Sequence, residues 1–324
     1  MTTVTLGKYR HLSRCANDAG HFIILAIDHR ANLWQALQTH SAEAVDASSF
    51  LAFKQSVLSV LPHTPHITGV LTDPAYGIGA GIARGSISGR QGLLAPIEVT
   101  DYDLPPDKRS VEFIPHWSVG SIKRVGGDGV KLLLHYHPSA SDRAEKESIV
   151  RQLVEACAQH DIPFFLEPIT YSLDPSRPLC TAELRQITVE MVRTFCQMGV
   201  DVLKLHFPVN IDETPHHDAW RSACAEVDAA CTVPWVLLSA GVPFDVFCDQ
   251  AHIACLAGAS GVIVGRAVWH EAVTLQGEQR MNFIQQVMPQ RMSKLAAVCQ
   301  HGRPWTDRIH PPAVTSEWYV DSAR

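Results

Sequence analysis

The sequence lacks several features that mark common protein classes. Its 324 residues hold 27 basic and 33 acidic side chains, a formal net charge of −6. Without a basic excess, neither a nucleic acid nor an anionic membrane surface is expected as a partner. No uninterrupted apolar run reaches the roughly 18 residues that a membrane-spanning helix needs. Residues 1–20 contain no apolar stretch typical of a secretory signal, so we expect a cytoplasmic protein.

Paired cysteines, repeats and a glycine-rich first turn are also missing. The nine cysteines are odd in number, scattered singly and without a CxxC pair, so we expect reduced thiols in the core. The first apolar run is followed by Asp28-His29-Arg30-Ala31, and this turn disfavours a doubly wound nucleotide-binding fold. No internal repeat or low-complexity linker divides the chain.

Short apolar runs alternate with longer amphipathic segments along the chain. The runs are rich in Val, Ile, Leu and Phe, as expected of parallel strands covered on both faces. They cover residues 21–28, 67–74, 92–99, 129–137, 163–171, 201–208, 234–241 and 261–268. Helical patterns fall at about 46–60, 117–125, 142–160, 181–199, 217–230 and 243–258. Eight strands with intervening helices predict a single (β/α)₈ TIM barrel.

The expected domain organisation is one (β/α)₈ domain over residues 1–324. The barrel itself is expected over about 21–270, and a C-terminal helical extension and tail over 271–324. The glycine- and serine-rich stretch 75–90 is interpreted as a loop within the second β/α unit.

Polar residues stand near the carboxyl ends of these strands, where the active site of such a barrel lies. They are Asp28, Asp73, Glu98, Lys131, Glu167, Lys204, Ser239 and Arg266. Lys204 is conspicuous because it lies in the apolar run VDVLKLHF, and burying an unpaired ammonium costs several kcal/mol, roughly. Side-chain alternation allows Lys131, Glu167 and Lys204 to point inward together.

Two interpretations of this group remain open on the residues alone. The lysines and carboxylates could form a buried ion-pair network that only fixes the barrel core. Alternatively, one lysine has a lowered pKa, because of burial and a second cation nearby, and attacks a carbonyl to form a Schiff base. A third possibility is a divalent metal site made by His135 and His137 with His29 and His206, which would indicate metal-dependent catalysis.

Eight motifs in register resemble the class I tagatose-1,6-bisphosphate aldolase family, which also contains sulfofructose-phosphate aldolases. They are LAIDHR (25–30), LTDPAYG (71–77), WSVGSIKR (117–124), GVKLLLHYH (129–137), FFLEPITY (164–171), DVLKLHFPVN (201–210), LLSAGV (237–242) and GVIVGRAVW (261–269).

The resemblance implies a role for each matching residue. Lys204 matches the Schiff-base lysine, Glu167 the acid/base glutamate, and Lys131 and Asp28 polar residues of the same pocket. Phosphate binding is implied for the ends of the last two strands, at Ser239, Gly241, Gly265 and Arg266. The family has glutamine where this chain has His29, a position expected to face the distal end of the substrate. Arg30 remains as a distal anion ligand.

The expected function is therefore a class I aldolase without metal or other cofactor. It would cleave a ketose 1,6-bisphosphate such as tagatose 1,6-bisphosphate into dihydroxyacetone phosphate and glyceraldehyde 3-phosphate. One alternative substrate is 6-deoxy-6-sulfofructose 1-phosphate, which would give dihydroxyacetone phosphate and sulfolactaldehyde. An alternative of another class is a non-catalytic sensor of sugar phosphates. A sugar phosphate is the expected small-molecule partner, and a homo-oligomer is compatible with the sequence.

Overall fold

The computed structural model describes residues 2–99 and 104–321, and its centre is a closed barrel of eight parallel strands. The strands are β2 (Phe22–Ile27), β3 (Gly69–Thr72), β4 (Gly92–Pro96), β7 (Gly129–His135), β8 (Phe164–Ile169), β9 (Val202–Leu205), β10 (Trp235–Leu237) and β11 (Gly261–Val264). They follow chain order around the barrel, and β11 pairs with β2 to close it. The predicted TIM barrel is thus confirmed, and each strand falls within its predicted range.

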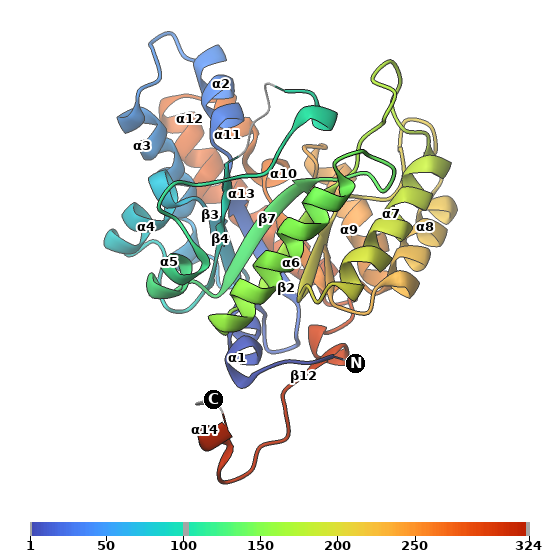
Figure 1. Ribbon diagram of the computed structural model, residues 1–324. Helices are drawn as coiled ribbons and strands as arrows, with labels where there is room; N and C mark the ends of the chain where they lie inside the picture. The colour runs from blue at the N-terminus through green and yellow to red at the C-terminus, as the bar shows by residue number, and fades with distance from the viewer. Residues whose placement is uncertain (1, 100–103, 322–324) are drawn as a thin grey trace.

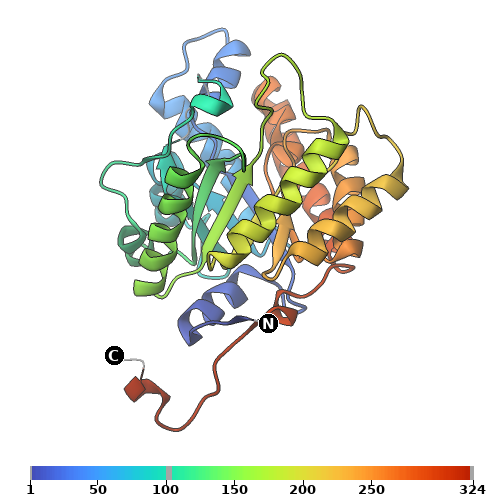
Figure 2. The same cartoon turned by 45° about the vertical axis from the view of Figure 1, so that its right-hand side comes forward.

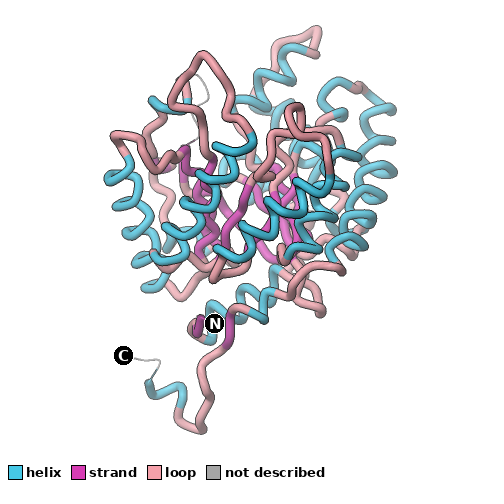
Figure 3. Tube along the Cα trace, turned by 90° about the vertical axis from the view of Figure 1, so that its right-hand side faces the viewer, coloured by secondary structure: helices cyan, strands magenta, loops and turns pink. Residues whose placement is uncertain are grey.

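Helices surround the barrel on all sides (Figures 1 and 2). They are α2 (Ala31–Thr39), α3 (Ala47–Leu58), α4 (Gly79–Ala83), α5 (Val119–Arg124), α6 (Arg143–Gln159), α7 (Thr181–Gln197), α8 (His217–Ala230), α9 (Phe244–Ala257), α10 (Arg266–Trp269), α11 (Glu271–Thr274), α12 (Gly277–Asn282) and α13 (Met288–Cys299). The tube view shows the strands enclosed between them (Figure 3). In the described part of the chain, no helix is long and apolar enough to cross a membrane.

Alternation along the strands separates two apolar clusters. Outward residues such as Leu25, Leu132 and Leu203 pack under the helices, whereas Ile24, Phe165 and others fill the lower lumen. In this outer layer, Asp46 is the N-cap of α3, because its carboxylate accepts a hydrogen bond from the Ser49 N–H. The packed lower lumen leaves only the upper end of the barrel for a ligand.

The amino-terminal end of the barrel is closed by segments that the sequence analysis did not predict. Helix α1 (Leu6–Cys15) lies beneath the strands (Figure 1), and β1 (Thr2–Thr3) pairs in parallel with β12 (Ile309–His310). Trp305 packs against Tyr9 and Phe22, with ring centroids 4.8 and 6.4 Å away. From β12 the chain runs away from the barrel to the short helix α14 (Trp318–Asp321).

The first part of the stretch 75–90 is helical, in contrast to its interpretation as a loop, whereas residues 84–90 form turns as expected. A π-helix covers Pro74–Ile78 and continues into α4. Asp73 starts it, because its carboxylate accepts a hydrogen bond from the Tyr76 N–H at 2.9 Å. A side chain at Gly81 would lie 2.7 Å from Ile87, so this glycine permits close packing of the helix. A small antiparallel pair, β5 (Glu98–Val99) with β6 (Glu112–Phe113), follows β4.

Candidate active site

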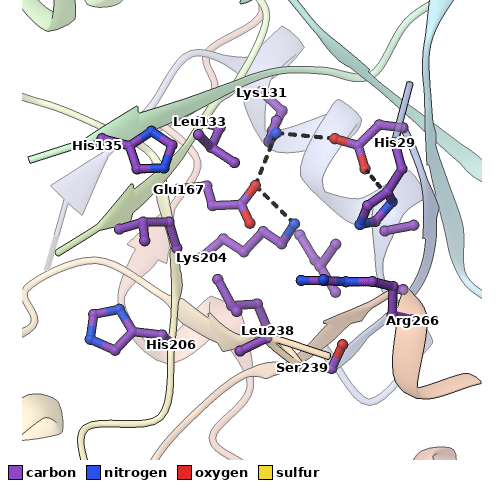
Figure 4. Close-up of a pocket in the computed structure, with 16 residues that line it drawn as sticks. His29, Lys131, Leu133, His135, Glu167, Lys204, His206, Leu238, Ser239 and Arg266 are labelled. Atoms are coloured by element: carbon purple, nitrogen blue, oxygen red, sulfur yellow. Dashed lines mark hydrogen bonds and ion pairs between the residues drawn. The ribbon is translucent and has the colours of Figure 1, made fainter. Parts of the chain in front are cut away.

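A pocket of about 260 Å³ opens at the carboxyl ends of the strands (Figure 4). It is lined by Ala26, Asp28, His29, Lys131, Leu133, His135, Glu167, Ile169, Lys204, His206, Leu238, Ser239, Ala240, Ile263, Gly265 and Arg266. Most of the candidate residues therefore meet in one place. Gly241 and Arg30 are the candidates that do not line it.

Lys131 is the centre of a buried ion cluster in this pocket. Its Nζ lies 3.0 Å from Asp28 Oδ2, 2.8 Å from Glu98 Oε1 and 3.0 Å from Glu167 Oε2. Burial would lower the pKa of Lys131, but the carboxylates of Asp28, Glu167 and Glu98 outweigh it and hold that pKa well above its ordinary value. Lys131 is consequently a fixed cation.

The pKa values of the carboxyl groups around Lys131 are shifted in different directions. Burial would raise the pKa of both Asp28 and Glu167, but the ammonium groups of Lys131 and Lys204 reverse this, and both pKa values lie below the ordinary range. Burial prevails at Glu98, whose pKa is raised and whose Oε2 is buried without a hydrogen-bond partner. Glu167 is therefore ionised at neutral pH and able to accept a proton.

Strand register places Lys204 beside Glu167. Leu166 of β8 pairs with Leu203 of β9, so the next residues, Glu167 and Lys204, emerge side by side toward the lumen. Lys204 Nζ lies 3.0 Å from Glu167 Oε2, the same oxygen that faces Lys131. Lys204 is only 5% exposed, and it reaches the pocket through its amine (Figure 4). A buried amine is thus held within proton-transfer distance of an ionised carboxylate.

A polar cradle lies at the ends of β10 and β11. Ser239, Gly265 and Arg266 line the pocket there, and Gly265 opens the turn into α10. Gly241 has a φ of +85°, and a side chain on it would lie 3.1 Å from the Arg266 guanidinium. The absence of a side chain at Gly241 therefore leaves room for the Arg266 side chain. The Ser239 hydroxyl and the Arg266 guanidinium supply hydrogen-bond donors suited to a phosphate group.

The structure places His29 in the pocket lining and Arg30 outside it. A side chain on Gly265 would lie 3.0 Å from His29 Cε1, so His29 lies on the Arg266 side of the pocket. Burial, the Arg266 cation and other nearby cations lower the pKa of His29 to about 3 despite the Asp28 carboxylate, so the imidazole is neutral. Arg30 Nη2 donates a hydrogen bond to the Glu98 carbonyl oxygen at 2.7 Å.

The histidines of the proposed metal site make separate contacts. His135 Nε2 accepts a hydrogen bond from Arg109, and His137 Nδ1 accepts one from the Ser139 N–H. His206 Nε2 lies 3.1 Å from the Thr188 hydroxyl. Within residues 2–99 and 104–321, no three His, Cys, Asp or Glu side chains are grouped to hold a metal ion.

Glu98 is the member of the cluster that the sequence analysis did not assign to the site. It is only 2% exposed and contacts Lys131 from β5, two residues after the end of β4. Its position near the carboxyl end of a predicted strand was the sequence feature that could have assigned Glu98 to the site. Asp73, another strand-end carboxylate, instead pairs with the fully buried Lys54 behind the pocket.

Comparison with known proteins agrees with this geometry. Residues 22–271 match the family model described as DeoC/LacD family aldolase. A tagatose 1,6-diphosphate aldolase of Streptococcus agalactiae is 33% identical over 288 residues, which cover 83% of this chain and 87% of the relative. Tagatose 1,6-diphosphate aldolase 2 of Enterococcus faecalis is 33% identical over 291 residues, covering 84% and 86%.

Solved structures share the fold at low sequence identity. An archaeal fructose 1,6-bisphosphate aldolase has a TM-score of 0.57 at 18% identity, covering 90% of this chain and 99% of that one. Fructose-bisphosphate aldolase of Plasmodium falciparum has a TM-score of 0.66 at 11% identity, covering 93% and 97%. The resemblance found in the sequence is thus confirmed. The chain is a lyase that belongs to the DeoC/LacD family of aldolases.

Proposed function

We propose that this protein is a class I aldolase that cleaves a ketose 1,6-bisphosphate, such as tagatose 1,6-bisphosphate, into dihydroxyacetone phosphate and glyceraldehyde 3-phosphate. The observation that carries the proposal is the buried Lys204 amine 3.0 Å from Glu167, in a pocket whose wall also presents Ser239 and Arg266. The names of the relatives from Streptococcus agalactiae and Enterococcus faecalis support this substrate.

The proposed reaction begins when Glu167 takes a proton from Lys204, 3.0 Å away, and leaves a free amine. The amine attacks C2 of the ketose, Glu167 returns the proton to the departing hydroxyl, water leaves, and a protonated imine forms. Glu167 then takes the proton of the C4 hydroxyl while the electrons of the C3–C4 bond move into the imine nitrogen, which releases the aldehyde. The remaining enamine takes a proton at C3, and water attack on the imine releases dihydroxyacetone phosphate and the free amine. The imine serves as the electron sink, so no metal or other cofactor is needed.

The other polar residues have supporting roles in this scheme. Lys131 remains charged and compensates the carboxylates of Asp28 and Glu98 while Glu167 changes its protonation. Ser239 and Arg266 bind the C1 phosphate and thereby align C2 with the amine. Gly241 and Gly265 shape this cradle, and His29 supports it as a neutral neighbour of Arg266.

Borohydride trapping tests the proposal. The protein is incubated with dihydroxyacetone phosphate, reduced, digested and mapped by peptide mass spectrometry. We expect a stable adduct on Lys204 and none in Lys204→Met, which should also lose turnover while retaining its fold. An adduct on Lys131 with Lys204 unmodified would assign the nucleophile to β7 instead. Binding of sugar phosphates without turnover or adduct would indicate the non-catalytic sensor.

A further inference from the structure

We propose that His135 and Arg109 form the subsite for the second anion of the substrate, the terminal phosphate or sulfonate at C6 of the ketose. The inference rests on the proposed function. It starts from the position of His135, which lies at the opposite side of the Lys204–Glu167 pair from Arg266 and Ser239 (Figure 4).

The shape of the substrate requires a binding group on that side. When C2 is bonded to Lys204 and the C1 phosphate is held by Arg266, carbons C3 to C6 extend away from Arg266. His29 lies against Gly265 on the Arg266 side. Arg30 is bonded to the Glu98 carbonyl oxygen and does not line the pocket. His135, in contrast, lines the pocket on the side away from Arg266, and Arg109 reaches this wall through its contact with His135.

Arg109 gives His135 the properties of an anion ligand. Arg109 Nη1 donates to His135 Nε2 at 2.7 Å, and Arg109 Nε donates to the Leu104 carbonyl oxygen at 2.7 Å. Since a guanidinium only donates, the neutral imidazole keeps its proton on Nδ1 and can donate it to a ligand. Burial and the Arg109 charge lower the pKa of His135 to about 3, so this tautomer persists at neutral pH.

The surroundings favour an anion over a second cation. His135 and Leu133 also border a small cavity of about 20 Å³ that Arg109 and Ser110 line from the other side. Three acidic side chains of this region have a lysine within 3.5 Å: Glu98 with Lys131, Asp142 with Lys146, and Asp107 with Lys108. The Arg109 charge thus lies next to the His135 donor, on the side of the pocket that C6 of the substrate would reach.

The test compares Arg109→Gln with the wild-type enzyme on three substrates: a ketose 1,6-bisphosphate, its 6-sulfonate analogue and the ketose 1-phosphate without the distal anion. We expect KM for the two substrates that carry a distal anion to rise at least tenfold, with little change for the 1-phosphate. His135→Gln should act in the same direction. The substrate that the wild-type enzyme cleaves with the higher kcat/KM identifies whether phosphate or sulfonate is the natural distal group.

Lys108→Gln is the matched control, because it removes a neighbouring charge on a side chain that is 70% exposed. It should leave all three KM values unchanged. An equal rise in KM for all three substrates of Arg109→Gln would show a merely structural role. No rise in KM for the bisphosphate and the sulfonate analogue would place the distal anion elsewhere, for example at His206. Either result overturns the inference. Failure of the wild-type enzyme to cleave any of the three would instead refute the proposed function.

Discussion

Replacing Lys131 by methionine should test the electrostatic account of the site. The substitution preserves an unbranched side chain of similar length but removes the cation that contacts Asp28, Glu98 and Glu167. Glu167 keeps Lys204 as a partner at 3.0 Å. Asp28 and Glu98 lose their closest cation inside the barrel, and an uncompensated buried charge is strongly destabilising.

The magnitude follows from the least costly way of removing that charge, which is to protonate a carboxylate. For a glutamate of ordinary pKa near 4.3, protonation at pH 7 costs about 3.7 kcal/mol, whereas at pH 5 it costs about 1 kcal/mol. We therefore expect Lys131→Met to lower the free energy of unfolding by about 4 kcal/mol at pH 7. This is a large share of the roughly 5–15 kcal/mol typical of a folded domain.

The sign of the pH dependence is a second, independent test. In the wild-type protein the pKa values of Asp28 and Glu167 are lowered, so their contribution to stability is complete above about pH 5 and is lost as the pH falls through the lowered pKa values. In the variant, the carboxylates without a cation have raised pKa values, so stability increases as the pH falls from 7 to 5. The deficit of the variant should shrink by about 3 kcal/mol over this range.

Urea unfolding at pH 7 and pH 5 measures both quantities. Lys294→Met is the control, because its amine is exposed and lies 3.6 Å from Asp245, and such surface pairs contribute only about 0–1 kcal/mol. Adding Glu98→Gln to Lys131→Met should restore part of the lost stability. A deficit below 1 kcal/mol at pH 7, or one that does not change with pH, would refute the reasoning.

Three further predictions concern the phosphate cradle, the buried imidazole and metal. Arg266→Ala should raise KM at least tenfold, with Arg266→Lys intermediate, because a charge-assisted contact is lost; an unchanged KM in steady-state assays would make Arg266 structural. Burial lowers the pKa of His206 to about 4, so its contribution to stability is complete above about pH 6.5 and is lost toward pH 4. His206→Asn should therefore reduce the loss in the free energy of unfolding between about pH 6.5 and pH 4, measured by urea unfolding, by at most about 3 kcal/mol. Activity should survive EDTA; loss restored by zinc would contradict the imine mechanism.

The sequence predicted the strands well because each is a nearly continuous apolar run. It could not predict β1 and β12, since two-residue strands carry no periodicity and owe their pairing to the closure of the barrel. The first part of the stretch 75–90 was misinterpreted because glycine suggests a loop. At Gly81 the missing side chain instead allows a helix to approach Ile87.

Side-chain alternation also predicted that Lys131, Glu167 and Lys204 would meet, and the structure confirms that it brings them together. Residues beyond the strand ends were harder to place. The direction of His29 depends on its packing with Trp269 and Gly265, and Arg109 lies on a loop whose path no local pattern determines. Alternation fixes a side chain within a strand, whereas loop residues depend on contacts made far along the sequence.

The closure beneath the barrel has a consequence for the order of folding. Strand β2 acquires its neighbour β11 only after residue 264 has been synthesised, and Phe22 is covered by Trp305 later still. Until then, the first strand and α1 present apolar surface to the solvent without their final partners. Such late, long-range closure slows folding and exposes intermediates to aggregation. We therefore expect chains that stop before Trp305 to need chaperones or low concentration to remain in solution.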